Sequence, residues 1–173
     1  RCFAKFLHDE GLTDQRRITV ETPDRSIQLE IEDGWQVTVD MGPPLFEPPG
    51  VPFDAPEQAN VYALEVAGEI VELSAISMGN PHAVLLVEEV EAAPVSRIGP
   101  AIEYHPRFPK RTNVCFARPT NRGQIQLRVW ERGVGETRAC GSGACAAVVA
   151  CRRLGQVDAA DVQTRVAGMD PAF

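Results

Sequence analysis

Alternation of apolar and polar residues predicts most of the strands in this chain. In residues 124–130 every second residue is apolar, and this period of two is typical of a strand with one buried face. Residues 27–31 alternate in the same way, and the Asp33-Gly34 pair that follows is typical of a hairpin. From these patterns we expect strands at 18–20, 27–31, 35–39, 61–66, 70–76, 83–87, 113–116, 124–130 and 162–166.

Three other segments have helical patterns. Residues 1–10 place apolar side chains on one face, and Gly11 follows as a stop signal. Residues 94–104 also have an apolar side, although Pro100 opposes a helix there. Residues 144–154 begin with eight small apolar residues in a row, which predicts a buried helix.

A proline-rich segment divides the chain. Residues 41–56 contain six prolines and two glycines, too many for regular structure. We therefore expect an N-terminal domain in residues 1–42, a boundary segment at 43–56 and a C-terminal domain in residues 57–173. The predicted elements place both in the α+β class.

Composition narrows the possible partners. The chain has 173 residues, a formal charge of −7 and a pI near 5.0, which argues against nucleic acid or an anionic membrane surface as partner. It contains no apolar run near the ~18 residues that cross a bilayer. Its five cysteines are odd in number and lack the C-x-x-C spacing of metal sites. A reducing cytoplasm is the expected location.

The candidate chemistry lies just before the third predicted helix, at Cys140-Gly141-Ser142-Gly143. A helix N-terminus offers several unpaired N–H groups and about half a positive charge. Glycines there let a ligand approach the backbone. We therefore expect the helix to lower the pKa of Cys140 and its N–H groups to hold a carboxylate or phosphate.

The other cysteines have a simpler interpretation. Cys145 and Cys151 lie within the apolar run, and Cys115 lies within a predicted strand. Buried cysteines usually behave as small apolar residues, so we expect all three to be core residues. Cys140 differs because it lies between polar residues and two glycines.

The segment around Cys140 contains Glu131-Arg132-Gly133, Glu136-Thr137 and Ala139-Cys140-Gly141-Ser142-Gly143-Ala144-Cys145. It closely resembles the second cysteine motif of the diaminopimelate epimerase family, which interconverts LL- and meso-diaminopimelate for lysine and peptidoglycan synthesis. The resemblance implies an amino-acid epimerase that uses no cofactor and no metal. It also implies two pseudo-symmetric, mostly antiparallel β domains, each around a central helix.

Two further segments resemble the same family. Gly79-Asn80-Pro81-His82 matches a motif in which the Asn binds substrate and the His lies near the reacting carbon. Thr112-Asn113-Val114 matches a segment whose Asn also contacts substrate. On local grounds alone, Asn80 also fits an ordinary turn and Asn113 a strand end. His8 and His105 match no motif and are expected at the surface.

The start of the chain matches only the end of the family's first cysteine motif. Arg1 and Cys2 correspond to its last two positions, so the catalytic cysteine that opens the motif would precede residue 1. Cys2 is expected to be a packing residue. Both ends of the sequence resemble cut ends, and residues 1–42 would be the remainder of a domain. We expect no net epimerisation by residues 1–173 alone, with any α-proton exchange limited to one stereoisomer.

Epimerisation at Cα requires an acid/base on each face of the substrate. By resemblance Cys140 is one of the two, and a thiol suits the task because its pKa can be brought toward neutrality. The N–H groups of Gly141 and Ser142 are suited to stabilise charge on the substrate carboxylate. His82 and Glu131 are expected to tune the thiols.

The remaining roles concern substrate binding. Arg132 is suited to pair with a carboxylate, and Glu131 to hold an ammonium group. Diaminopimelate has two amino-acid ends, and Asn80, Asn113 and Arg132 are the candidates for reading the distal one. Which end each residue contacts is left open by the sequence.

Two other functions stay open. A related racemase acting on proline, hydroxyproline or histidine would keep the Cys-Gly-Ser-Gly element but change its flanks. A catalytically incomplete domain that only binds a carboxylate is the other alternative. The sequence does not determine the oligomeric state, and a homodimer is compatible with the family.

Overall fold

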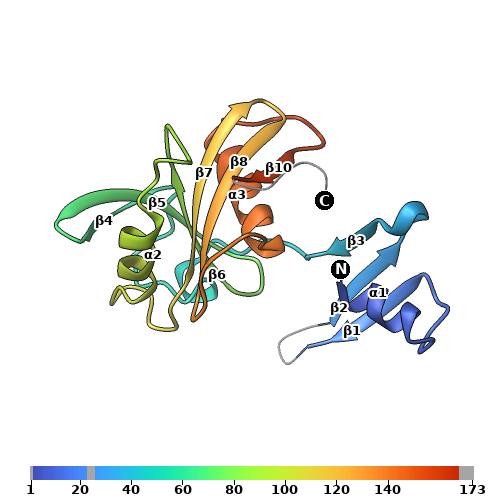
Figure 1. The fold of residues 1–173 in the computed structure, drawn as a ribbon. Helices are drawn as coiled ribbons and strands as arrows, with labels where there is room; N and C mark the ends of the chain where they lie inside the picture. The colour runs from blue at the N-terminus through green and yellow to red at the C-terminus, as the bar shows by residue number, and fades with distance from the viewer. Residues whose placement is uncertain (1, 23–25, 168–173) are drawn as a thin grey trace. The chain divides into compact units, whose positions relative to one another are not determined.

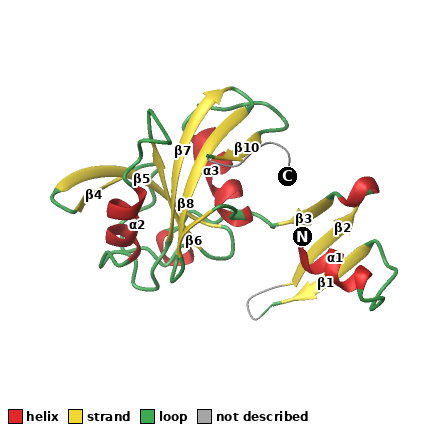
Figure 2. Cartoon of the chain, in the orientation of Figure 1, coloured by secondary structure: helices red, strands yellow, loops and turns green. Residues whose placement is uncertain are grey.

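The computed structural model describes residues 2–22 and 26–167, which form two compact units, Arg1–Pro43 and Pro44–Phe173. The described residues of unit 1 form a three-stranded antiparallel sheet, the α-helix α1 and a short 3-10 helix (Figure 2). Its small core contains Ala4, Leu29 and Ile31. The elements of unit 1 are α1 (Cys2–Asp9), β1 (Arg17–Glu21), β2 (Ser26–Ile31), the 3-10 helix η1 (Asp33–Trp35) and β3 (Val37–Asp40).

Two predictions for unit 1 are wrong in detail. Trp35 does not open a strand, because the connection after β2 is a 3-10 turn in which Gly34 has φ 73° and Trp35 has φ 62°. The strand therefore begins only at Val37. Cys2 is exposed rather than packed, since the buried face of α1 is formed by Ala4.

Unit 2 is built on one larger sheet (Figure 1). Its strand order is β10-β8-β7-β6-β5-β4, and β9 pairs with the last three residues of β8, Val129 to Glu131. The β6–β7 and β8–β10 pairings are parallel, and the other pairings of this sheet are antiparallel. The predicted α+β class is confirmed. Its elements are η2 (Pro48–Gly50), β4 (Tyr62–Val66), β5 (Glu69–Ser77), β6 (Pro81–Leu86), α2 (Val95–Glu103), β7 (Asn113–Asn121), β8 (Gln124–Glu131), β9 (Gly135–Thr137), α3 (Gly141–Arg153) and β10 (Gln163–Val166).

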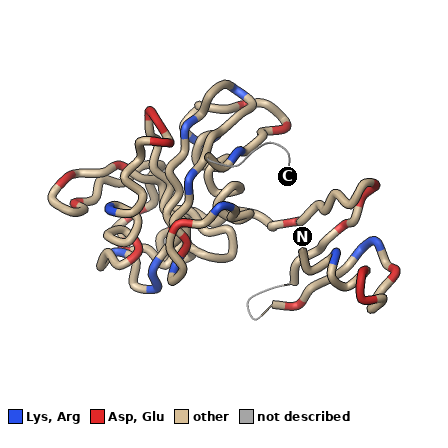
Figure 3. Tube along the Cα trace, in the orientation of Figure 1, with Lys and Arg blue, Asp and Glu red and all other residues tan. Residues whose placement is uncertain are grey.

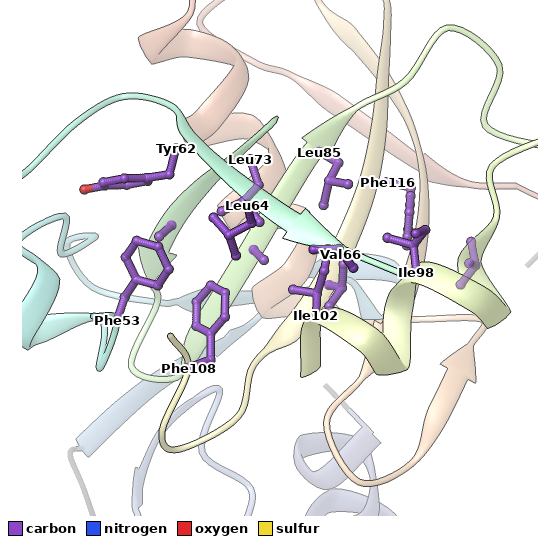
Figure 4. Close-up of a cluster of buried hydrophobic side chains, with 14 of the residues drawn as sticks. Phe53, Tyr62, Leu64, Val66, Leu73, Leu85, Ile98, Ile102, Phe108 and Phe116 are labelled. Carbon is purple, nitrogen blue, oxygen red and sulfur yellow. The ribbon is translucent and has the colours of Figure 1, made fainter. Parts of the chain in front are cut away.

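One face of this sheet carries the main hydrophobic core under α2 (Figure 4). Ile98 and Ile102 of α2 pack there with Phe116 of β7, and each is at most 1% exposed. Burying a side chain of this size contributes about 1.5–3 kcal/mol. This packing explains why α2 forms although Pro100, which lacks an N–H, lies inside it.

The opposite face of the sheet is covered by α3 (Figure 1). Successive side chains of a strand point to opposite faces, so Cys115 points away from the Phe116 core. Its thiol donates to the carbonyl oxygen of Gly143 in α3, with a distance of 3.7 Å. α3 presents only small residues to the sheet: its buried residues are Gly143, Ala146, Ala147, Ala150 and Cys151.

The proline-rich segment joins this packing although it has little regular structure. Val51 and Phe53 are buried in the main core, and the backbone of Leu45 pairs with that of Ser77. The guanidinium of Arg107 lies 4.4 Å from the centre of the Phe53 ring, a cation–π contact.

The third predicted helix begins three residues earlier than expected, at Gly141. Gly141, Ser142 and Gly143 therefore form its first turn, and Cys140 is the N-cap residue with an extended backbone. The short strand β9 was not predicted, because three residues are too few to show a periodic pattern. Within residues 2–22 and 26–167, no helix is long and apolar enough to cross a membrane.

Candidate active site

The register of three strands gathers the candidate residues at one end of the unit 2 sheet. β6 and β7 run parallel and begin side by side, with His82 opposite Asn113. β8 runs the other way and ends at Glu131, beyond the Val114–Trp130 pair. The period of two then places Asn113 on the face that carries Cys115, which is the face under α3.

His82 is fully buried at this sheet end. Its Nε2 lies 3.1 Å from Oδ1 of Asn80, and its Nδ1 lies 3.9 Å from the sulfur of Cys115. Burial, together with the positive charge of Arg132, lowers the pKa of His82 to about 4. The imidazole is therefore neutral at pH 7, with Nε2–H donating to the amide oxygen of Asn80 in the tautomer that this contact favours.

Asn113 connects the beginning of two strands with the end of a third. Its Nδ2 donates to the carbonyl oxygen of Pro81 at 3.2 Å, and its Oδ1 accepts the backbone N–H of Arg132 at 2.9 Å. The side chain is only 5% exposed. Its amide is thus oriented by the protein, with one further N–H on Nδ2 for another acceptor.

Glu131 and Arg132 end β8 with different surroundings. The Glu131 carboxylate accepts a hydrogen bond from the hydroxyl of Thr137, which lies across the β8–β9 turn. The Arg132 side chain is exposed, and its Nη1 donates to the carbonyl oxygen of Lys110 at 2.9 Å. The sequence motif contained Thr137 but gave no reason to assign it the role of holding Glu131.

Cys140 lies where α3 meets the sheet end. Its half-buried sulfur is 3.7 Å from the hydroxyl oxygen of Ser142. Gly143 lies close to two sulfurs, since a Cβ at this position would lie 3.1 Å from the sulfur of Cys140 and 3.2 Å from that of Cys115. The absence of a side chain therefore lets the first turn of α3 lie against both thiols. The first N–H groups of α3, those of Gly141 and Ser142 among them, lack a helical carbonyl partner.

The prediction of a lowered pKa for Cys140 is wrong. Burial raises the pKa of the thiol, and the negative charge of Glu131 raises it further. The backbone N–H of Gly143 and the hydroxyl of Ser142 act in the opposite direction without reversing the shift. The prediction considered the helix end alone, whereas the loss of water around the sulfur outweighs it.

The comparisons with known proteins agree on one family. A family model described as diaminopimelate epimerase matches residues 74–169, more than half of the chain. The chain belongs to the diaminopimelate epimerase family. It is 56% identical to the diaminopimelate epimerase of Pseudomonas syringae pv. tomato and 56% identical to that of Azotobacter vinelandii. Each of these matches covers 91% of the chain and 57% of the relative's length.

Solved structures show the same fold at low sequence identity. A hydroxyproline epimerase from Agrobacterium vitis matches with a TM-score of 0.62 at 20% identity, over 94% of this chain and 54% of that one. A probable proline racemase from Agrobacterium radiobacter matches with a TM-score of 0.66 at 17% identity, over 95% of this chain and 54% of that one. The predicted epimerase-type fold is therefore confirmed.

Within the diaminopimelate epimerase fold, the other reactive residues are placed as follows. Cys115 and Cys151 are buried as predicted, and burial raises the pKa of both thiols. Cys145 is only half-buried. His105 is half-buried and its Nδ1 accepts the backbone N–H of Arg107, outside the sheet end. Across the described parts of the chain, no group of three or more His, Cys, Asp or Glu residues is placed to hold a metal ion.

Proposed function

We propose that a protein carrying this sequence epimerises LL-diaminopimelate to meso-diaminopimelate without a cofactor. The observation that carries the proposal is the position of the Cys140 thiol, at the N-terminus of α3 and close to Glu131, in a family member. Relatives named diaminopimelate epimerase are 53–56% identical to this chain over the 158 matched residues. Lysine biosynthesis is the pathway that this activity serves.

In the proposed reaction the Cys140 thiolate removes the α-proton from one face of the substrate. The electron pair of the broken C–H bond moves into the carboxylate, where the N–H groups of Gly141 and Ser142 stabilise the added charge. A proton then returns from the opposite face. The family resemblance assigns that second role to the cysteine that opens the first motif, of which this sequence contains only Arg1 and Cys2.

The raised pKa of Cys140 fits this reaction if binding changes its surroundings. The Glu131 carboxylate raises that pKa in the substrate-free site. A substrate ammonium group next to Glu131 would offset this charge and would itself favour the thiolate. We therefore propose that substrate binding lowers the pKa of Cys140 and so activates the base only when it is needed.

The neutral His82 serves the site by orientation. It has no charge at pH 7, and its contact with Asn80 holds that amide at the turn before β6. We propose that Asn80 and Asn113 offer amide groups to the substrate, and that Arg132 pairs with a carboxylate. Arg132 is exposed, so it is free to turn from the Lys110 carbonyl toward a ligand.

The test uses a completed protein: residues 1–173 joined to those segments of the Pseudomonas syringae enzyme that lie outside the match. With LL-diaminopimelate in D₂O, we expect deuterium at Cα and formation of the meso isomer. Proline, hydroxyproline and histidine serve as competing substrates. Turnover of one of them instead of diaminopimelate would identify a related racemase, and binding without exchange would identify a carboxylate-binding domain.

We also propose a cytoplasmic location. A thiol acts as a base only while it is reduced, and the cytoplasm keeps thiols reduced. Fractionation of cells that produce the completed protein, with activity assayed in each fraction, would test this. Activity confined to an oxidising compartment would contradict it.

A further inference from the structure

A buried carboxylate at the end of α2 has no part in the reaction described above. Glu103 is the last residue of α2, and its side chain is only 2% exposed. An isolated carboxylate is costly to bury, so such groups are retained where hydrogen bonds satisfy them. The donors to Glu103 therefore indicate what it holds.

Two strong donors reach the carboxylate from the end of β8. Trp130 Nε1–H donates to Oε2 at 2.7 Å, and the backbone N–H of Gly133 donates to Oε1 at 2.9 Å. Trp130 and Gly133 flank Glu131 and Arg132 directly in the sequence. Glu103 thus holds the residues on both sides of Glu131 and Arg132, the proposed substrate-binding pair.

The indole is itself held against α2. A Cβ at Gly99 would lie 2.7 Å from Cγ of Trp130 and 2.8 Å from its Cβ, so only glycine lets the ring lie on the helix backbone. Gly99 is one helical turn before Glu103. One rigid helix therefore supplies both the surface and the acceptor that position the Trp130 side chain.

The turn after Glu131 is held by hydrogen bonds from two consecutive backbone N–H groups. Asn113 accepts the N–H of Arg132, and Glu103 accepts that of Gly133. Arg111, which lies in the loop that leads to Asn113, places Nη1 3.9 Å from Oε1 of Glu103 and has φ 60°. A positive φ is unusual outside glycine and persists where surrounding contacts hold it.

We propose that Glu103 is a positioning residue that fixes the Glu131–Arg132 turn and thereby sets the affinity for the substrate. This inference rests on the proposed function, because it takes Arg132 as a carboxylate-binding group. Glu103 acts through Trp130 and Gly133, so its effect should appear in substrate binding rather than in proton transfer by Cys140.

The first test examines the hydrogen bonds from Trp130 and Gly133 to Glu103, in the 1–173 chain without substrate. The chain has two tryptophans, Trp35 and Trp130. In Glu103→Gln, we expect the indole N–H resonance of Trp130 to shift upfield and the Gly133 amide to exchange at least tenfold faster. The indole resonance of Trp35 in unit 1 should not move. An unchanged Gly133 exchange rate would overturn the inference.

The second test measures kinetics in the completed protein. Glu103→Gln should raise KM for diaminopimelate about tenfold and lower kcat less than threefold. A residue that only stabilises the fold would instead lower kcat, through a smaller folded fraction, and leave KM unchanged; that result would overturn the inference. Glu103→Asp keeps the charge and should restore part of the affinity.

Two further variants guard against a loss of folding. Trp130→Phe removes the indole donor but keeps an aromatic ring, so KM should rise about threefold. An unchanged KM would contradict the positioning role of the Glu103–Trp130 hydrogen bond. Glu136→Gln removes a carboxylate from the same β8–β9 hairpin, where it pairs with Arg128 at 2.6 and 3.0 Å, and should leave KM unchanged. A wild-type completed protein without epimerase activity would refute the proposed function, while the Gly133 exchange rate would still decide whether Glu103 holds the turn.

Discussion

Among the described residues of unit 2, the α-helices α2 and α3 cover opposite faces of one sheet with very different side chains. α2 buries Val95, Ile98 and Ile102, and it packs on a core of aromatic and branched residues. α3 buries glycine, alanine and cysteine. The α2 face thus anchors the sheet through large contacts, whereas the α3 face brings a helix backbone close to the strands.

This difference has a chemical consequence at the sheet end. Small residues let the first turn of α3 lie close to Cys115. A Cβ at Gly143 would make tight contacts with the sulfurs of Cys140 and Cys115. The helix N–H groups and the Cys140 thiol thereby lie near the ends of β6, β7 and β8. On the other face, Ile98 and Ile102 of α2 pack in the core that contains Val114 and Phe116 of β7.

The two faces meet in the turn after β8. From the α2 face Glu103 holds the N–H of Gly133, and on the α3 face Thr137 holds the carboxylate of Glu131. One face therefore contributes rigidity and the other contributes reactive groups. Substitutions on each face should consequently fail in different ways.

The largest effect is expected on the α3 face. In the completed protein, Cys140→Ser should lower the epimerisation rate by about 10²–10⁴-fold, the usual contribution of a positioned acid/base. Substrate affinity should change less than about threefold, because the backbone N–H groups remain. Chiral chromatography of the products and calorimetric titration measure the two quantities. Cys145→Ala, on the same helix, is the matched control, and wild-type turnover in Cys140→Ser would exclude Cys140 as the base.

On the α2 face, Gly99→Ala should act on stability. The added Cβ would lie 2.7 Å from the Trp130 ring, and overpacking of this kind costs about 1–3 kcal/mol. The free energy of unfolding, measured by denaturant titration, should fall by this amount. Ser96→Ala on the exposed side of α2 should change it by less than about 0.5 kcal/mol. Equal stability of the two variants would contradict the packing of Trp130 on α2.

Gly143→Ala should separate activity from stability. Its Cβ would press on the sulfurs of Cys140 and Cys115 at 3.1 and 3.2 Å, and we expect about a tenfold loss of epimerisation from the displaced thiol. Gly123→Ala in the β7–β8 turn is the control, because it lies outside the candidate site and a Cβ there would meet its nearest neighbour, Ala159, at 3.4 Å. The comparison fails if both variants have the same activity.

The smallest effect concerns the pKa of Cys140. Because burial and Glu131 raise this pKa, alkylation by iodoacetamide should accelerate with pH until the pH exceeds it. Glu131→Gln removes one raising influence, so labelling of Cys140 at pH 8 should become a few times faster. Mass spectrometry measures the rates, with exposed Cys2 as the internal reference. Identical rates in the variant and the wild type would show that Glu131 does not act on the thiol.

Local patterns predicted the elements better than their edges. The alternation in residues 124–130 correctly indicated β8, and the run of small residues indicated α3. β9 was missed because it is short and depends on pairing with β8. The turn at Trp35 was missed because a positive φ is unusual for a tryptophan. Such features depend on partners that lie outside any local window.

The candidate site divides in the same way. The residues around Cys140 and the Asn80–His82 segment were found because their motifs are contiguous in the sequence. Glu103 was missed because nothing in its local pattern distinguishes it from a solvated helix residue. Its burial under Trp130 arises from a contact across 27 positions.

The sequence by itself determined the periodic elements, the family and the candidate reactive residues, because each depends on nearby residue types and their spacing. Only the tertiary structure decided that β6 and β7 begin beside the end of β8, that Glu103 holds the turn after Glu131, and that the pKa of Cys140 is raised. Strand register and the exclusion of water are set by segments far apart in the chain. They exist only once the sheet is packed on both faces.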